Sequence, residues 1–488
     1  MSKMTCQIRY VNPPDLSPRR RGLLWAAVVS GLLLAMLDQT IVGTALPRIV
    51  GDLGGPSWYV WAFTCYLVPA TVLLPVATRL SDRTGRRDML LLGMALFLVG
   101  SAVCALAGSM PVFVAGRTTQ GAGAAALEAL SFLVVNELAR DSKRGAGQAA
   151  ISAVMAISFI AGPLIGGLLT DHVGWRWAFL VNLPVGLAAM VMLLRSLPAG
   201  FGRMESRRTD VDLAGIACLV LGIGALLVAL NRHQQLGDWL LPSTGGALVC
   251  GVLGIVLFLR VEATAAAPIV PLRLLADPAS ARLLLAGAFA TTGLYACVLL
   301  VPRWYQLDGG LDATGAGIRV YPLLVALLVG VNVGAVLVSR GGLRVPLVAA
   351  SAVTLAGALA FLGLGASSAA VLPLAAMALL GLGMGPQLSG LQIALSRSVA
   401  PRDLAAAMGT LLLGRQVIGA VALAAGDALF RSRAATHGDS AGTGWAIAWV
   451  AGAGAVVAAL ALVAGRRRPG SRAAARLPGR AYDGSVSR

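Results

Sequence analysis

The stretch LLLAMLDQTIVGTALP at residues 32–47 places one carboxylate, Asp38, in an otherwise apolar run. The run begins near residue 23, and about 20 predominantly apolar residues are enough to cross a bilayer as a helix. A charged side chain at this depth is costly and usually faces a partner, a cavity or a transport path. The stretch therefore predicts a membrane span whose acid is either ion-paired or functional.

The composition extends this interpretation to the whole chain. Of the 488 residues, 57% are hydrophobic and 12% are charged, whereas a soluble domain has about 25% charged residues. The net charge of +18 does not indicate a nucleic-acid partner, because the basic residues occupy short gaps between apolar runs. The expected environment is the lipid bilayer.

Apolar runs bounded by charges or turn residues predict an all-α polytopic membrane protein with fourteen transmembrane helices. Helices are expected because a bilayer offers the backbone no hydrogen-bond partners. The runs lie near residues 23–47, 57–79, 88–107, 111–137, 147–170, 175–195, 211–230, 241–260, 281–302, 317–339, 345–366, 370–396, 404–430 and 445–465.

The basic residues predict the orientation of the spans. With the N-terminus inside, 30 of the 39 Lys and Arg fall on the inner side and 7 on the outer side. The other two, Arg117 and Arg415, lie within spans. Inner loops of membrane proteins are the basic ones. We therefore expect a multi-pass protein of the cell membrane with both termini in the cytoplasm, and a first span that is retained rather than cleaved as a signal peptide.

A weak internal repeat divides the chain. A shift of 262 residues places Gly121 on Gly383, Gly123 on Gly385 and Asp141 on Asp403. Duplicated halves are typical of transporters, with the substrate path between them. The predicted parts are a cytoplasmic N-terminal tail (1–22), an N-terminal six-helix half (23–200), two inserted helices (201–265), a C-terminal six-helix half (266–465) and a basic cytoplasmic C-terminal tail (466–488).

The loop after the second run reads RLSDRTGRR, residues 79–87. It resembles the cytoplasmic loop signature of the major facilitator superfamily, although Thr78 replaces the first glycine of that signature. An acid at a helix end can be stabilised by the dipole of a partner helix, and arginine forks bind carboxylates. The resemblance implies a loop latch formed by the five matching residues Asp82, Arg83, Gly85, Arg86 and Arg87.

The fourth run contains RTTQGAGA at residues 117–124, which resembles the motif that the superfamily associates with proton coupling. Glu128 lies eleven residues after Arg117, three helical turns further along the same face. Arg117 and Asp38 lie at depths that differ by about one helical turn, at about 1.5 Å per residue. We therefore predict a direct or water-bridged contact between Asp38 and Arg117.

The fifth run contains GPLIGG, which matches the motif of the superfamily's antiporter branch at Gly162, Pro163, Gly166 and Gly167. Small residues allow close helix approach. The stretch around Asp38, the segment 174–184 and the segment 415–419 are also similar to the fourteen-helix drug:proton antiporter branch. This resemblance implies a major facilitator fold and export rather than uptake.

These features predict a secondary transporter that exports amphipathic drug- or antibiotic-like compounds in exchange for protons by alternating access. The proton gradient supplies the energy and no cofactor is expected, and the protein is expected to act as a monomer. Asp38, Arg117 and Glu128 are the proposed coupling residues, and Asp38→Asn is expected to abolish coupled export while folding is largely kept. Further polar residues predicted to line the cavity are Gln39, Gln120, Arg415 and Gln416. Arg415 is predicted to face the cavity or a polar network, and a helix-packing role is the alternative.

Other functions are less well supported by the sequence. Export of an endogenous lipid, siderophore or amino acid by the same mechanism stays open. An enzyme is disfavoured because the three histidines, His172, His233 and His437, lie in predicted outer loops without acids at catalytic or metal-binding spacing. The six cysteines have no spacing typical of a disulfide framework or a metal site.

Overall fold

The structure is a computed structural model that describes residues 17–55, 58–139, 145–197, 201, 212–238, 240–265, 268, 270–363, 371–400 and 403–464. All regular elements in these ranges are helices. The N-terminal half contains α1 (Pro18–Leu53), α2 (Tyr59–Val72), α3 (Leu74–Thr84), α4 (Arg86–Ala105), α5 (Met110–Ala139), α6 (Gly145–His172), α7 (Trp177–Leu180) and α8 (Asn182–Ser196).

The remaining helices follow in the same order as the predicted runs. The inserted pair is α9 (Leu213–Leu236) and α10 (Pro242–Thr264). The C-terminal half contains α11 (Leu272–Ala276), α12 (Pro278–Phe289), α13 (Thr292–Leu307), α14 (Ala313–Arg319), α15 (Tyr321–Gly341), α16 (Arg344–Ala360), η2 (Phe361–Gly363), α17 (Val371–Ser398), α18 (Leu404–His437) and α19 (Asp439–Val463).

The all-α prediction is confirmed, and a helix or broken helix pair lies at each of the fourteen predicted runs. In the described residues, 12 helices are long and apolar enough to cross a membrane, or 13 when the bent pair of α2 and α3 is counted as one span. The apolar part of α9, Ala214–Leu230, is shorter. The exact count of fourteen spans therefore stays a prediction.

Close helix packing occurs in both halves, although the repeat-related glycines face different neighbouring helices. In the N-terminal half, a Cβ on Gly121 of α5 would lie 2.2 Å from the carbonyl oxygen of Tyr66 in α2. In the C-terminal half, a Cβ on Gly383 of α17 would lie 2.3 Å from Thr354 Oγ1 in α16. Both repeat-related positions thus leave no room for a side chain. The repeat position Asp141 lies outside the described residues.

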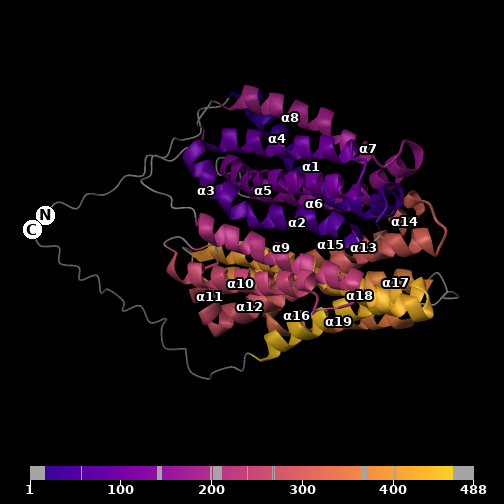
Figure 1. Cartoon of the computed structure of the whole chain (residues 1–488). Helices are drawn as coiled ribbons and strands as arrows, with labels where there is room; N and C mark the ends of the chain where they lie inside the picture. Colours follow the sequence, from indigo (N-terminus) through magenta and orange to yellow (C-terminus); the bar gives the residue numbers. More distant parts are fainter. Residues whose placement is uncertain are drawn as a thin grey trace, which may run out of the picture.

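The two halves occupy different regions of the molecule, with α9 at the boundary between them and α10 packed against α9 (Figure 1). The inserted helices pack on each other through Gly222 and Gly254, and α9 also contacts α2 and α18. Large apolar side chains of α10, such as Val249 and Leu253, are exposed, as expected for a surface in contact with lipid. The inserted pair therefore bridges the halves on one side.

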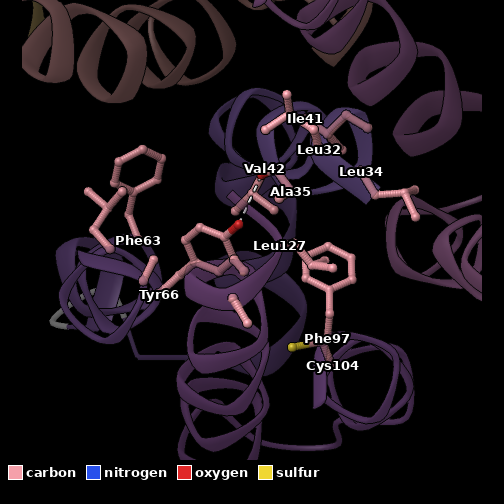
Figure 2. Packing of buried hydrophobic residues seen from close by; sticks show 14 of the residues in the cluster. Leu32, Leu34, Ala35, Ile41, Val42, Phe63, Tyr66, Phe97, Cys104 and Leu127 are labelled. Atoms are coloured by element: carbon pink, nitrogen blue, oxygen red, sulfur yellow. Dashed lines mark hydrogen bonds between the residues drawn. The ribbon is translucent and has the colours of Figure 1, made fainter. Parts of the chain in front are cut away.

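The core of the N-terminal half lies among α1, α2, α4 and α5 (Figure 2). Leu32, Phe97 and Leu127 are buried there. The hydroxyl of Tyr66 enters this core and donates a 2.9 Å hydrogen bond to the carbonyl oxygen of Ala35 in α1. This bond ties α2 to α1 next to the turn that carries Asp38.

Candidate functional site

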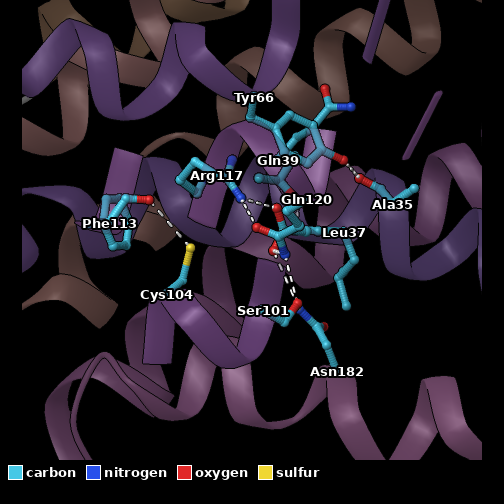
Figure 3. A network of polar contacts seen from close by, with 12 residues as sticks. Ala35, Leu37, Gln39, Tyr66, Ser101, Cys104, Phe113, Arg117, Gln120 and Asn182 are labelled. Carbon is cyan, nitrogen blue, oxygen red and sulfur yellow. Dashed lines mark hydrogen bonds and ion pairs between the residues drawn. The ribbon is translucent and has the colours of Figure 1, made fainter. Parts of the chain in front are cut away.

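The first part of the site is an ion pair between α1 and α5 (Figure 3). Nη1 of Arg117 donates to Oδ2 of Asp38. The side chain of Arg117 is fully buried and that of Asp38 is 1% exposed. The predicted direct contact between these residues is therefore confirmed, whereas their role in coupling stays a prediction.

Three neutral side chains complete the surroundings of the carboxylate (Figure 3). Gln120 receives a hydrogen bond of 2.7 Å from Arg117 and donates one of 2.7 Å to Oδ1 of Asp38. It also donates to the hydroxyl of Ser101 in α4 at 2.9 Å. Asn182 of α8 donates to the same hydroxyl at 3.1 Å and to Asp38 at 3.4 Å. We call these five residues the buried network.

The buried network joins four helices of the N-terminal half. Gln120 was predicted to line a cavity. It is instead fully buried, and both ends of its amide are hydrogen-bonded inside the network. Neither Ser101 nor Asn182 was predicted as a site residue, although Asn182 lies in the segment 174–184. They are neutral residues in distant spans, and no spacing links them to Asp38.

Aromatic rings cover the rest of the guanidinium group. The Cζ atom of Arg117 lies 4.2 Å from the ring centroid of Tyr66 and 6.0 Å from that of Phe179. Within the described residues, Nε and Nη2 of Arg117 have no hydrogen-bond partner. An aromatic face attracts a cation most strongly where water is excluded. The positive charge is therefore held by one carboxylate and an aromatic ring.

Glu128 lies apart from the buried network, although it shares a helix with Arg117. Its carboxylate accepts a 3.1 Å hydrogen bond from Nε2 of Gln39 in α1. The side chain is 9% exposed, so it is less enclosed than Asp38. Since Gln39 directly follows Asp38, the buried network fixes the part of α1 that reaches Glu128.

The C-terminal half presents a second polar pair near this point. Tyr295 of α13 donates a 2.7 Å hydrogen bond to Oε1 of Gln416 in α18, and its hydroxyl lies within electrostatic range of both Glu128 and Arg415. Glu128 of one half and Tyr295 of the other are thus within electrostatic range of each other, and their hydrogen-bond partners are Gln39 and Gln416, respectively. Tyr295 was missed in the sequence because it carries no charge at neutral pH.

Arg415 was predicted to face the cavity or a polar network. Its side chain is instead buried against two helices, donating to the carbonyl oxygens of Gly287 in α12 at 3.3 Å and Leu388 in α17 at 3.1 Å. In this conformation the contacts correspond to a helix-packing role. The physical reason is that these two backbone carbonyl oxygens accept hydrogen bonds from the guanidinium group, so its donors are satisfied there by backbone rather than by a carboxylate.

The C-terminal half also has a buried acid, Asp427 of α18, whose side chain is 1% exposed. It accepts from Arg303 at 3.3 Å and from Arg431 at 2.9 Å. The predicted runs end near residues 302 and 430, just before these two arginines, whereas α13 and α18 extend through them. Arg303 also lies 4.9 Å from the ring centroid of Tyr59 in α2, so this cluster touches both halves.

The segment 79–87 forms a sharp helix–helix corner. Gly85 separates α3 from α4 with a φ of 101°, a conformation that favours glycine. The backbone N–H of Arg86 donates to the carbonyl oxygen of Phe201 at 2.7 Å, and Asp82 is within electrostatic range of Arg86 and Arg79. The predicted latch residues therefore share one corner, and their latch function stays a prediction.

The four GPLIGG residues pack α6 on two neighbours. A Cβ on Gly162 or Gly166 would collide with Thr40 or Thr44 of α1, at 1.8 and 2.4 Å from their hydroxyl oxygens. A Cβ on Gly167 would lie 2.5 Å from Cα of Thr314 in α14. The motif thus allows α6 to contact both its own half and the opposite one. Pro163 takes part, since its carbonyl oxygen faces α14 at Gly317.

These features define a polytopic helical membrane protein with a buried charge network and polar groups from both halves close together. Residues 28–423 match the family described as the Major Facilitator Superfamily. The chain belongs to this superfamily, whose members are transporters rather than enzymes.

Several curated relatives are similar over much of the chain. It is 31% identical over 385 residues to "Multidrug transporter protein MdtP" of Bacillus subtilis (strain 168), covering 79% of this chain and 71% of that protein. It is 30% identical over 319 residues to "Multidrug resistance protein 3" of the same organism, covering 64% and 61%. It is 33% identical to "Uncharacterized MFS-type transporter Rv1877" of Mycobacterium tuberculosis (strain ATCC 25618 / H37Rv), covering 67% and 48%.

Solved structures support the fold. The "POT family transporter PepTSo" has a TM-score of 0.64 at 14% identity, covering 92% of this chain and 98% of that chain. A bacterial homologue of the human lysosomal transporter Spinster, in an "Inward-facing And Unoccupied Conformation", has a TM-score of 0.62 at 14% identity, covering 92% and 96%. These likenesses concern the fold alone.

Proposed function

We propose that this transporter exports amphipathic, drug- or antibiotic-like compounds in exchange for protons, from a cell membrane in which both termini face the cytoplasm. The observation that carries the proposal is Glu128, a buried carboxylate with a neutral hydrogen-bond donor, Gln39, within electrostatic range of Tyr295 in the opposite half. The names of the relatives as multidrug transporters support the substrate class.

Glu128 is the exchange acid in this proposal. Its carboxylate has a neutral donor rather than an arginine, so it can bind either a proton or the polar or cationic part of a substrate. A proton that arrives from outside neutralises Glu128 and releases the substrate there. Loss of the proton to the cytoplasm restores the carboxylate for the next substrate, and rocking of the two halves alternates access.

Asp38 has a different role in the proposal. Its charge is already balanced by Arg117, and its oxygens accept from Arg117, Gln120 and Asn182. It holds α1 so that Gln39 reaches Glu128. This changes one expectation from the sequence: Asp38→Asn should weaken folding, because it leaves the fully buried Arg117 without its carboxylate partner.

The test is substrate-driven proton movement in everted membrane vesicles containing the wild type, Glu128→Gln or Glu262→Gln. The compounds are amphipathic cations, neutral antibiotics, a lipid, a siderophore and an amino acid. Adding a transported compound should dissipate the proton gradient with the wild type. Glu128→Gln should lower this exchange more than tenfold, by analogy with the loss of an essential proton-transfer group, about 10²–10⁴-fold.

Glu262→Gln is the matched control. Glu262 is also a buried carboxylate, but it lies in α10 and accepts from the backbone of Val270, so exchange should be retained. Wild-type exchange by Glu128→Gln would refute the role of Glu128. Exchange of only the lipid, siderophore or amino acid would replace the proposed substrate class.

A further inference from the structure

The outer ends of the two halves, meaning the ends that the charge pattern predicts to face outside, are in direct contact. These ends include α7 and α14, at the opposite side of the molecule from α3 and α11 (Figure 1). Gln306 donates from the end of α13 to the carbonyl oxygen of Thr44 in α1 at 2.9 Å. Tyr59 of α2 donates to the carbonyl oxygen of Leu299 in α13 at 3.1 Å. The described conformation is thus closed at its outer ends.

Among these contacts between the halves, the carboxylate of Asp171 makes the most hydrogen bonds. Asp171, near the end of α6, accepts three hydrogen bonds from the first two residues of α14 in the opposite half. They come from the backbone N–H of Ala313 at 3.1 Å, the backbone N–H of Thr314 at 2.7 Å and the hydroxyl of Thr314 at 2.6 Å. Hydrogen bonds to an ionised acceptor are stronger than neutral ones.

Next to this carboxylate, α6 and α14 pack closely because a glycine of each helix faces the other helix. Gly167 lies one turn before Asp171, and a Cβ there would be 2.5 Å from Cα of Thr314. On the opposite helix, a Cβ on Gly317 would be 2.5 Å from the carbonyl oxygen of Pro163. The glycines bring α6 and α14 together, and Asp171 then bonds the start of α14. We call these contacts the α6–α14 clasp.

The clasp is more accessible to water than the buried network, and this accessibility favours a contact that forms and breaks in each transport cycle. Asp171 is only partly buried, so water can replace its hydrogen bonds when the halves separate. Asp38 is 1% exposed, and separating its partners would leave charges without solvent. The outer clasp is therefore a reversible contact, whereas the buried network is permanent.

We infer that Asp171 is a gating residue: its hydrogen bonds to Ala313 and Thr314 hold the outer ends closed, and their release is needed for the outward-open state. The inference goes beyond the proposed exchange reaction, because it concerns the balance between conformations in the absence of any substrate. Removing the bonds should shift that balance toward outer opening.

The experiment measures distances between pairs of spin labels by pulsed electron paramagnetic resonance in lipid nanodiscs, in a background with the six native cysteines replaced. The outer pair is Val173 with Leu307, and the inner pair is Thr84 with Leu275. All four side chains are exposed, and each pair spans the two halves. Asp171→Ala should lengthen the outer distance and shorten the inner one, shifting the ratio of the two states by about tenfold for a loss of about 1.4 kcal/mol.

Two further variants make the result specific. Thr314→Val removes one of the three hydrogen bonds and should give a smaller shift in the same direction. Asp308→Ala is the matched control, because Asp308 is an outer carboxylate that accepts from the Ser440 hydroxyl within its own half at 2.6 Å. It should leave both distances unchanged.

The inference is overturned if Asp171→Ala and Thr314→Val keep wild-type distances, or if the outer distance changes without the reciprocal inner change. It is also overturned if Asp308→Ala shifts both distances as strongly as Asp171→Ala. No substrate or proton gradient enters the measurement, so its failure is distinct from failure of the exchange proposal.

Discussion

Arg117 in α5 and Arg415 in α18 are both arginines buried within a predicted span, yet their surroundings differ. Arg117 is paired with Asp38 and lies over the ring of Tyr66. Arg415 donates to the backbone carbonyls of Gly287 and Leu388. One arginine balances a carboxylate, whereas the other joins α18 to α12 and α17.

The difference assigns separate roles to the two halves. Asp427 shares α18 with Arg415, but it pairs with Arg303 and Arg431 three turns further along. The N-terminal half therefore combines a charge pair with the nearby Glu128. In the C-terminal half, Arg415 packs helices together, and Tyr295, which is bonded to Gln416, is within electrostatic range of Glu128. Charge substitutions should consequently have unequal effects in the two halves.

The largest effect is expected for Arg117→Gln. It leaves the Asp38 carboxylate buried without its cation, and breaking a buried ion pair in this way costs about 3–5 kcal/mol. We expect a marked fall in the thermal unfolding temperature of the purified protein in detergent, and loss of exchange in vesicles. An unfolding temperature equal to that of the wild type would show that Asp38 does not depend on Arg117.

The double variant Asp38→Asn with Arg117→Gln tests whether the loss of stability comes from the unpaired charge. Both charges are gone, so no uncompensated charge remains and part of the lost stability should return relative to Arg117→Gln alone. Measurement of all four forms of the pair gives the coupling energy. Purely additive losses would contradict the ion pair as the dominant contact.

The spans and the Asp38–Arg117 pair could be predicted from the sequence because each depends on one simple constraint. A long apolar run in lipid must become a helix, and a buried acid and arginine at similar depth attract each other. The helix breaks were not predicted. One of them is the 49° bend between α2 and α3, which depends on the packing of neighbouring helices.

Other parts of the site depend on contacts between distant residues. Ser101 and Asn182 are ordinary polar residues until the fold brings them within 3.1 Å of each other. The cavity predictions for Gln120 and Arg415 differ from the structure for a related reason. Depth can be read from a sequence, but the direction in which a side chain points within a bundle depends on which helices surround it.

A smaller effect is expected for Arg415→Gln. The variant removes a charge that pairs with no carboxylate in the described part of the chain, and it leaves two carbonyl oxygens without this donor, so the expected cost is about 1–3 kcal/mol. Vesicles should retain most of the exchange once expression is matched. A loss of exchange as complete as that of Glu128→Gln, with unfolding unchanged, would move Arg415 from packing into the transport mechanism.

The smallest effect is expected for Asn182→Ala, which tests whether charge or network connectivity stabilises the N-terminal half. Asn182 donates a neutral hydrogen bond to Asp38 at 3.4 Å, whereas Gln120 and Arg117 provide shorter contacts to the same carboxylate. Its removal should cost about 1 kcal/mol and lower the thermal unfolding temperature slightly. The number of protons exchanged per substrate should stay the same.

Asn332→Ala is the control for this last variant, because Asn332 is an exposed amide in α15 that bonds locally, to the carbonyl oxygen of Leu328 at 2.8 Å. It should leave the unfolding temperature unchanged. If Asn182→Ala were instead as costly as Arg117→Gln, the five residues would act as one cooperative unit. The contrast between the halves would then lie in a shared hydrogen-bond network, rather than in the single pair of charges.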